Sequence, residues 1–175
     1  MPITLRMPDV DDAHPLSDLL TRNRDYFRTG EPLRSDAFYT PAHQATVITA
    51  ARASGEEGSA YMFLIEDDGV LVGRANLSSV IRGAFQSASV GYAVDEAHAG
   101  RGIATAALRA LIDIGFGRLD LHRLQGETVT GNVASQRVLA ACGFQQYGTA
   151  PDYLRIDGHW QAHELYQLIN PNWSG

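Results

Sequence analysis

The feature that most constrains the fold is a one-sided apolar helix set between two strand-like segments. Apolar side chains recur at helical spacing within Arg101–Phe116, at Ile103, Ala107, Leu108, Leu111 and Ile114. Phe85–Val94 before this segment and Leu124–Val129 after it are expected to be strands. A helix that joins two strands favours a parallel pair with a right-handed crossover. We therefore expect an α/β fold with a mixed sheet.

Local signals predict the remaining elements. Thr40–Ala53 is expected to be a helix, with Thr40 as N-cap and Pro41 at its first position, and Ser54–Gly58 is expected to break the chain. The sequence Asp67-Asp68-Gly69 is a hairpin signal. The other expected helices are Asp9–Asn23 and Val133–Cys142, and the other expected strands are Ile3–Arg6, Tyr61–Glu66, Val70–Leu77, Phe144–Tyr147, Tyr153–Ile156 and Trp160–Ile169. No repeat or linker interrupts this order, so residues 1–175 are predicted to form a single domain.

Composition excludes several classes of function. The net charge of −6 argues against nucleic acid as the main partner, because neutralising phosphates needs a basic surface. The chain contains no lysine, which excludes a P-loop lysine and a lysine Schiff base. The single cysteine, Cys142, excludes an internal disulfide, and no apolar run is long enough to span a membrane. We therefore expect a cytoplasmic protein without a membrane partner.

Gly100-Arg101-Gly102 lies between the predicted strand and the start of the apolar helix. Helix N-termini expose unpaired N–H groups and bind phosphates, and glycine permits close approach of the backbone. A helix start without a ligand explains the same pattern equally well. A dinucleotide-binding fingerprint is not met, because its third glycine is replaced by Thr105, and a Walker motif would need lysine.

Several blocks of the sequence together resemble the GCN5-related N-acetyltransferase (GNAT) superfamily. Val90–Thr105 resembles the family's motif A, and Glu127–Ser135 followed by Ala141–Phe144 resembles its second block. Asn23–Phe27 and the tail Asp152–Trp160 resemble the subgroup that acetylates the N-terminal alanine or serine of ribosomal proteins. The resemblance covers almost the whole chain in the right order, which makes it far more specific than the glycine loop alone.

The resemblance implies the GNAT fold, with splayed central strands, helices on both faces, acetyl-CoA as cosubstrate and no metal. The pantetheine arm is expected in the V between the two central strands. Main-chain contacts to the acetyl end and pantetheine are implied for Tyr92, Ala93 and Val94, and pyrophosphate contacts for Gly100, Arg101, Gly102, Ile103, Ala104 and Thr105. Asn132 is expected to hydrogen-bond the pantetheine arm, to cap the following helix, or to do both.

The implied reaction is direct attack of a neutral amine on the thioester. Glu127 stands where several N-terminal acetyltransferases of the family carry a glutamate base, although a solvated strand glutamate is an equal alternative. Leu139 replaces a tyrosine that protonates the departing thiolate in many members, and the ribosomal-type subgroup often lacks that tyrosine. Ser135 is the candidate for the missing acid, and a merely local hydrogen bond is its alternative.

The acceptor is less constrained than the cosubstrate. A protein N-terminus is favoured, a small amine such as an antibiotic, polyamine or amino acid is the alternative, and a non-catalytic acyl-CoA-binding module is the third hypothesis. Cys142 is expected to be a core residue, and His159 with His163 lacks a third ligand for a metal site. Asp152 and Tyr153 are candidates for the acceptor side, with a turn or sheet role as the alternative. Family members are often dimers, so a homodimer is an expectation from the resemblance alone.

Overall fold

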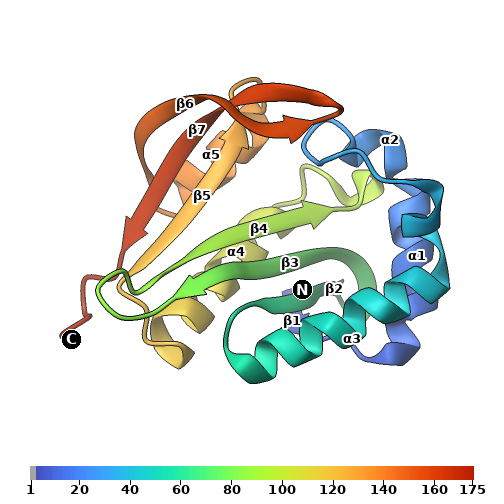
Figure 1. Cartoon of the computed structure of the whole chain (residues 1–175), viewed down its shortest axis with the longest axis horizontal. Coiled ribbons are helices and arrows are strands. Elements are labelled where there is room, and N and C mark those ends of the chain that lie inside the picture. The colour runs from blue at the N-terminus through green and yellow to red at the C-terminus, as the bar shows by residue number, and fades with distance from the viewer. Residues whose placement is uncertain (1–2) are drawn as a thin grey trace.

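The strands of the protein form one mixed sheet in the order β1-β2-β3-β4-β5-β7-β6 (Figure 1). The computed structural model describes residues 3–175. The strands are β1 (Ile3–Arg6), β2 (Tyr61–Asp67), β3 (Val70–Ile81), β4 (Ser87–Val94), β5 (Arg123–Val129), β6 (Gln145–Ile156) and β7 (His159–Ile169). The helices are α1 (Ala13–Arg22), α2 (Arg24–Phe27), α3 (Pro41–Glu57), α4 (Ile103–Asp113) and α5 (Val133–Ala141). All neighbours in the sheet are antiparallel except β4 and β5, which are parallel as predicted for strands joined by a helix.

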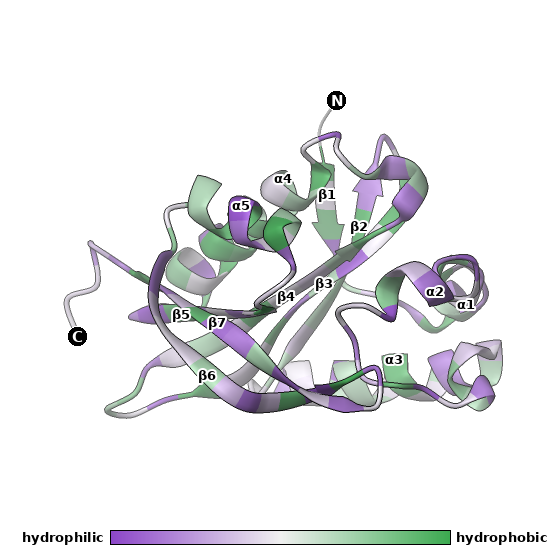
Figure 2. Ribbon diagram, turned by 90° about the horizontal axis from the view of Figure 1, so that it is seen from above, coloured by the Kyte–Doolittle hydropathy of each residue, from purple (hydrophilic) through white to green (hydrophobic). Residues whose placement is uncertain are grey.

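Helices cover both faces of the sheet, which confirms the predicted α/β class (Figure 2). One core lies between the sheet and α4 with α5, and its fully buried members include Leu108, Leu111 and Leu124. A second core lies on the opposite face, where Leu16 and Ile48, from α1 and α3, pack with Leu64 of β2. The two cores follow from the alternation of side chains along each strand. No helix within residues 3–175 is both long and apolar enough to cross a membrane.

The predicted end of the helix over Thr40–Ala53 was wrong. Thr40 accepts a hydrogen bond from the His43 amide as the predicted N-cap, but α3 continues past Ala53 to Glu57. Gly55 is accommodated within the helix, and only Gly58 ends it, because its φ of 75° is the left-handed conformation that closes a helix C-terminus. Composition alone suggested a break, whereas the helix tolerates one interior glycine.

The other differences concern the bounds of predicted elements and short helices that the sequence did not predict, namely α2 and a 3₁₀ turn at Asp36–Tyr39. Val10–Asp12 forms a 3₁₀ turn before α1, α4 begins two residues later than predicted, and a π-helical turn at Ile114–Arg118 follows it. Except for Phe144, the predicted segments Phe144–Tyr147 and Tyr153–Ile156 belong to one long strand, β6, whose register with β7 shifts between Ala150 and Leu154.

The two central strands separate soon after they begin. Their parallel ladder comprises the pairs Ser87↔Arg123, Ala88↔Leu124 and Ser89↔Gln125, and it ends there. Beyond it, β4 stays paired with β3 and β5 stays paired with β7, so the strands diverge toward their C-terminal ends (Figure 1). This is the V expected from the resemblance.

Candidate active site

A cleft of about 950 Å³ occupies the V between β4 and β5. Its walls include Tyr92, Ala93 and Val94 on one side and Glu127–Val129 on the other. A gap between two strands passes through the sheet, and the lining of this cleft comes from elements on both faces. The cleft is therefore open to groups from α4 and α5 on one face and from the α2 region on the other.

The loop before α4 provides an anion-binding surface at one end of the cleft. Gly100 and Gly102 have φ values of 74° and 79°, a left-handed conformation that glycine adopts without strain. Gly102 is the N-cap of α4, so the amides of Ile103 and the residues after it form the open first turn of the helix. A Cβ added at either glycine would meet nothing within 4 Å, and the cleft lining includes Gly100, Gly102, Ile103, Ala104 and Thr105. The cradle thus has room and unpaired donors for a phosphate group.

Arg101 differs from the other predicted residues of this loop. Its guanidinium pairs with Asp67, the last residue of β2, at 3.0 Å, and its side chain is absent from the cleft lining among residues 3–175. A contribution of Arg101 to cosubstrate binding therefore stays a prediction that concerns its main chain alone.

Asn132 caps α5 while lining the cleft. Its Oδ1 accepts a hydrogen bond from the Ser135 amide at 3.0 Å, which confirms the predicted N-cap. Its Nδ2 has no hydrogen-bond partner within the described part of the chain and lies near Gly30. The cap therefore leaves a donor available to a ligand in the cleft, as required if the residue has both roles.

Glu127 lies on β5 at the opposite side of the cleft from the glycine loop. Its half-buried carboxylate accepts a hydrogen bond from Ser89 Oγ at 3.1 Å. Burial raises the pKa of Glu127, while the Ser89 hydrogen bond and the nearby His163 partly oppose that increase. A carboxylate with a raised pKa is a stronger base than a solvated one, so the geometry suits proton transfer.

His163 and Tyr153 complete the surroundings of Glu127. His163 on β7 is buried and lines the cleft, and its Nδ1 lies 2.9 Å from the carbonyl oxygen of Gln161. Because a carbonyl only accepts, Nδ1 carries the proton in the neutral ring and leaves Nε2 as an acceptor. The Tyr153 ring lies 5.3 Å from the His163 ring, and burial followed by the charge of Glu127 raises the pKa of Tyr153.

The sequence marks out His163 only as a possible metal ligand beside His159. Among residues 3–175, no group of three or more His, Cys, Asp or Glu is placed to hold a metal ion. The relevant signal is the register, because Val129 pairs with His163 and Glu127 with Leu165, which makes Glu127 and His163 diagonal neighbours on one face. That register depends on which strand inserts beside β5, and the sequence alone does not show it.

Ser135 lies at the start of α5 and also lines the cleft. Its Oγ lies 3.0 Å from the hydroxyl oxygen of Tyr92, which comes from β4. Leu139, one turn further along α5, is buried against Gly126 of β5. Cys142 is half-buried, its Sγ lies 3.6 Å from the carbonyl oxygen of Thr105, and burial raises the pKa of the thiol. The high pKa and the packing fit the predicted core role of this cysteine.

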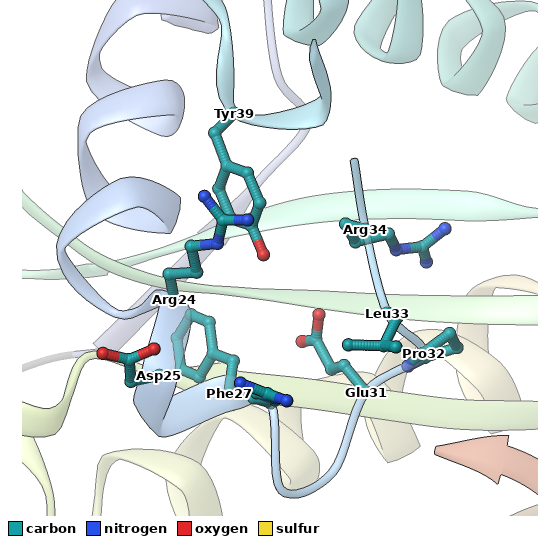
Figure 3. A pocket seen from close by; sticks show the side chains of 9 residues that line it. Arg24, Asp25, Phe27, Glu31, Pro32, Leu33, Arg34 and Tyr39 are labelled. Carbon is teal, nitrogen blue, oxygen red and sulfur yellow. The ribbon is translucent and has the colours of Figure 1, made fainter. Parts of the chain in front are cut away.

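Side chains from the segment after α2 close the other end of the cleft. Arg74 of β3 forms a half-buried ion pair with Glu31 at 2.6 Å, and Arg28 pairs with Asp157 at the tip of the β6–β7 hairpin. A smaller pocket of about 150 Å³ adjoins this region, and Figure 3 shows the Glu31 carboxylate and the Tyr39 hydroxyl pointing into it. Asp152 has a φ of 47° at the register shift in β6, so a turn role fits it, whereas Leu154 lines the cleft.

The fold and the site define a class of protein. A mixed sheet that splays at its one parallel pair, with a glycine-lined helix start at the open end, is the architecture of an acyl-CoA-dependent N-acyltransferase. Residues 3–145 match the family described as the acetyltransferase (GNAT) domain. The chain belongs to the GNAT family and is an N-acetyltransferase.

Relatives and solved structures agree with this assignment. The chain is 37% identical to the probable N-acetyltransferase YjcK of Bacillus subtilis, covering 97% of this chain and 95% of the relative. It is 31% identical to the ribosomal protein uS5-alanine N-acetyltransferase of Escherichia coli, covering 98% and 90%. The structure of ribosomal-protein-S5-alanine acetyltransferase from Vibrio fischeri superposes with a TM-score of 0.95 at 31% identity, covering 100% of this chain and 97% of that one. Mycobacterium smegmatis RimJ, solved in complex with CoA-disulfide, gives a TM-score of 0.92 at 31% identity and covers 95% and 81%.

Proposed function

We propose that this chain transfers the acetyl group of acetyl-CoA directly to the α-amino group of a protein N-terminus. One observation carries the proposal: the half-buried Glu127 carboxylate, held by Ser89, faces the same cleft that the glycine loop lines at its other end. A carboxylate base on one side of the cleft and an anion-binding loop on the other suit a reaction between an amine and acetyl-CoA, which carries a pyrophosphate. The E. coli and V. fischeri relatives, both named for alanine acetylation on a ribosomal protein, favour a polypeptide acceptor.

Acetyl-CoA would supply the activated thioester. Amides at the start of α4 would hold its pyrophosphate, because the Gly100 and Gly102 cradle is open and the amides of the first helical turn have no backbone partner within residues 3–175. Asn132 Nδ2 would donate to the pantetheine arm, and the diverging main chain at Tyr92–Val94 would position the acetyl end. The M. smegmatis structure with a CoA derivative supports this assignment.

Glu127 would take the proton of the attacking amine, directly or through a water molecule. An α-amino group of pKa about 7.8 costs only about 1 kcal/mol to deprotonate at pH 7, whereas a lysine of pKa about 10.4 costs nearly 5 kcal/mol. A carboxylate is a sufficient base for the first amine but a poor one for the second. The chemistry of Glu127 therefore favours an N-terminal acceptor.

Ser135 would face the sulfur on the other wall of the cleft. As nitrogen attacks the carbonyl carbon and the carbon–sulfur bond breaks, the sulfur takes the bonding electron pair. A hydroxyl donor at that point stabilises the developing charge. Leu139 has no donor to offer, so this task falls to Ser135.

The same proposal extends to the whole chain. Residues 1–175 would work as one domain, since β7 lies beyond the matched residues 3–145 yet inserts between β5 and β6 in the same sheet. A ribosomal or other intracellular polypeptide acceptor would place the protein in the cytoplasm.

The test is a thiol-release assay with purified protein, acetyl-CoA and a panel of acceptors. The panel contains a peptide beginning with alanine, the same peptide with a blocked N-terminus, a blocked peptide with one lysine, polyamines and free amino acids. We expect turnover with the free N-terminus, and Glu127→Gln is expected to lower kcat/KM by about 100-fold. Glu164→Gln on the opposite face of β7 is the matched control and is expected to retain activity.

Three outcomes would overturn parts of the proposal. Turnover with polyamines or amino acids alone would replace the acceptor class. Tight acetyl-CoA binding without turnover of any acceptor would indicate a binding module. Full activity of Glu127→Gln would remove Glu127 as the base.

A further inference from the structure

Two hydroxyl groups from distant parts of the chain meet on the wall of the cleft. Tyr92 Oη, from β4, lies 3.0 Å from Ser135 Oγ and 3.4 Å from the Ser135 carbonyl oxygen, at the start of α5. Both residues line the cleft. Within residues 3–175, Tyr92 is the only hydrogen-bond partner of the Ser135 hydroxyl.

We propose that Tyr92 is a positioning residue, which donates its hydroxyl hydrogen to Ser135 and thereby leaves the Ser135 hydrogen free for the departing sulfur. The proposal rests on the proposed function, because it concerns the same acetyl transfer. It assigns a role to the Tyr92 side chain, whereas the family resemblance involves only its main chain.

The direction of the hydrogen bond follows from the distances. The single phenol hydrogen of Tyr92 cannot go to both oxygens, and the proposal assigns it to Ser135 Oγ at 3.0 Å, because the Ser135 carbonyl oxygen at 3.4 Å lies beyond the usual O–H···O distance. Burial raises the pKa of Tyr92 to about 12, so the phenol keeps its proton throughout the working pH range. Ser135 Oγ then accepts from Tyr92, and its own hydrogen has no other partner in the described residues.

Tyr92 supplies the phenol that position 139 lacks, because that position holds a leucine. Leu139 is buried against Gly126, so α5 offers no phenol to the cleft at that turn. Tyr92 brings a phenol to the same cleft from β4, and its hydroxyl oxygen lies 3.0 Å from Ser135 Oγ. Hydrogen bonds in a chain polarise one another, so a serine that accepts from tyrosine is a better donor than an isolated serine.

The step balances without a net loss of the tyrosine proton. The amine proton goes to Glu127, the carbon–sulfur electron pair goes to sulfur, and Ser135 stabilises the thiolate by donating to it. The phenol remains protonated, as its high pKa requires.

Steady-state kinetics of three variants test the proposal. Tyr92→Phe removes only the hydroxyl and is expected to lower kcat by about 10-fold, the lower end of effects from groups that orient a functional side chain, with an unchanged KM for acetyl-CoA. Ser135→Ala is expected to lower kcat by about 100-fold, as for loss of a donor to a developing charge. The double variant is expected to match Ser135→Ala alone, because Tyr92 acts through Ser135. Tyr61→Phe, at a half-buried tyrosine against the same core that does not line the cleft, is the matched control and should behave as wild type.

The outcomes separate this inference from the proposed function. Wild-type turnover of the alanine peptide tests the function by itself. If wild type is active, an unchanged kcat in Tyr92→Phe overturns the inference, as do additive effects in the double variant. A fall in thermal stability that parallels the loss of activity would assign Tyr92 a structural role and overturn it too.

Discussion

Gly73 on β3 packs closely against the main chain of β4. A methyl group added at this position would change the shape of the cleft. A Cβ added there would lie 2.4 Å from the carbonyl oxygen of Ala93, 3.1 Å from Ile65 Cδ1 and 3.2 Å from Val94 Cα. A carbon ordinarily stays about 3.3 Å or more from a carbonyl oxygen. Gly73→Ala therefore requires the β4 main chain to move by about 0.9 Å, because the obstacle is backbone and cannot rotate away.

The displacement should affect stability and activity differently. Overpacking of a buried site costs about 1–3 kcal/mol, which corresponds to about 0.5–1.5 M in the urea midpoint at an m-value of about 2 kcal/mol/M. Ala93 and Val94 belong to the wall proposed to position the acetyl end, and a misplacement of about 1 Å costs about 100-fold in rate. The loss in kcat/KM should therefore exceed what the lost folding free energy explains.

Urea denaturation and the thiol-release assay would measure the two effects on the same preparations. Gly148→Ala is the matched control, since Gly148 also lies in a strand and a Cβ there meets nothing within 4 Å. That variant is expected to stay within about 0.5 kcal/mol of wild type and to keep its activity. If Gly73→Ala denatures with the same midpoint as Gly148→Ala and retains full kcat/KM, the close approach of β3 to β4 does not determine the geometry of the cleft.

Three further predictions concern charge, capping and acceptor choice. Burial raises the pKa of Glu127 in the folded protein, so its ionisation opposes folding as the pH rises above the ordinary glutamate value of about 4.3. Glu127→Gln should therefore unfold at a higher temperature than wild type at pH 8, with an advantage that disappears near pH 4; a pH-independent difference would contradict this. Asn23 is buried and joins two elements, donating to the Leu19 carbonyl at 2.9 Å and accepting from the Glu96 amide at 2.9 Å, so Asn23→Ala should lower the free energy of unfolding by about 2 kcal/mol or more in urea titrations. From the pKa values of the amines alone, a free N-terminus should outpace a lysine side chain by about 300-fold at pH 7 and by about 25-fold at pH 9. A ratio that stays constant with pH would show that amine deprotonation does not control the choice.

The sequence predicted those parts of the protein whose signals are local. The helix N-caps Thr40 and Asn132 were predicted correctly because a capping side chain and the amide it accepts from lie within three residues. The crossover through α4 and the parallel pair followed from the order of periodic segments. The glycine loop was placed correctly for a similar reason, since a strand, two glycines and an apolar helix are consecutive.

Contacts between distant segments were not predictable in the same way. The Tyr92–Ser135 pair and the approach of His163 to Glu127 depend on which strands neighbour each other and in which register. The ion pairs Arg74–Glu31 and Arg28–Asp157 depend on where a loop after α2 folds back. Arginine and carboxylate side chains are common on any surface, so composition gives no hint of which pairs will form.

The short ladder between β4 and β5 has a consequence for the integrity of the sheet. Because the pairing stops at Ser89 and Gln125, two strand edges with unpaired backbone groups face each other inside the protein instead of at its rim. Most proteins protect such edges from pairing with other chains by charge, bulges or covering elements. Here the two unpaired edges border the cleft, between strands that are paired on their other sides with β3 and β7. A ligand that bridges the gap would bond to both strand edges as an inserted strand would. Hydrogen exchange of the backbone amides at the edges of β4 and β5 should therefore slow when the cosubstrate binds.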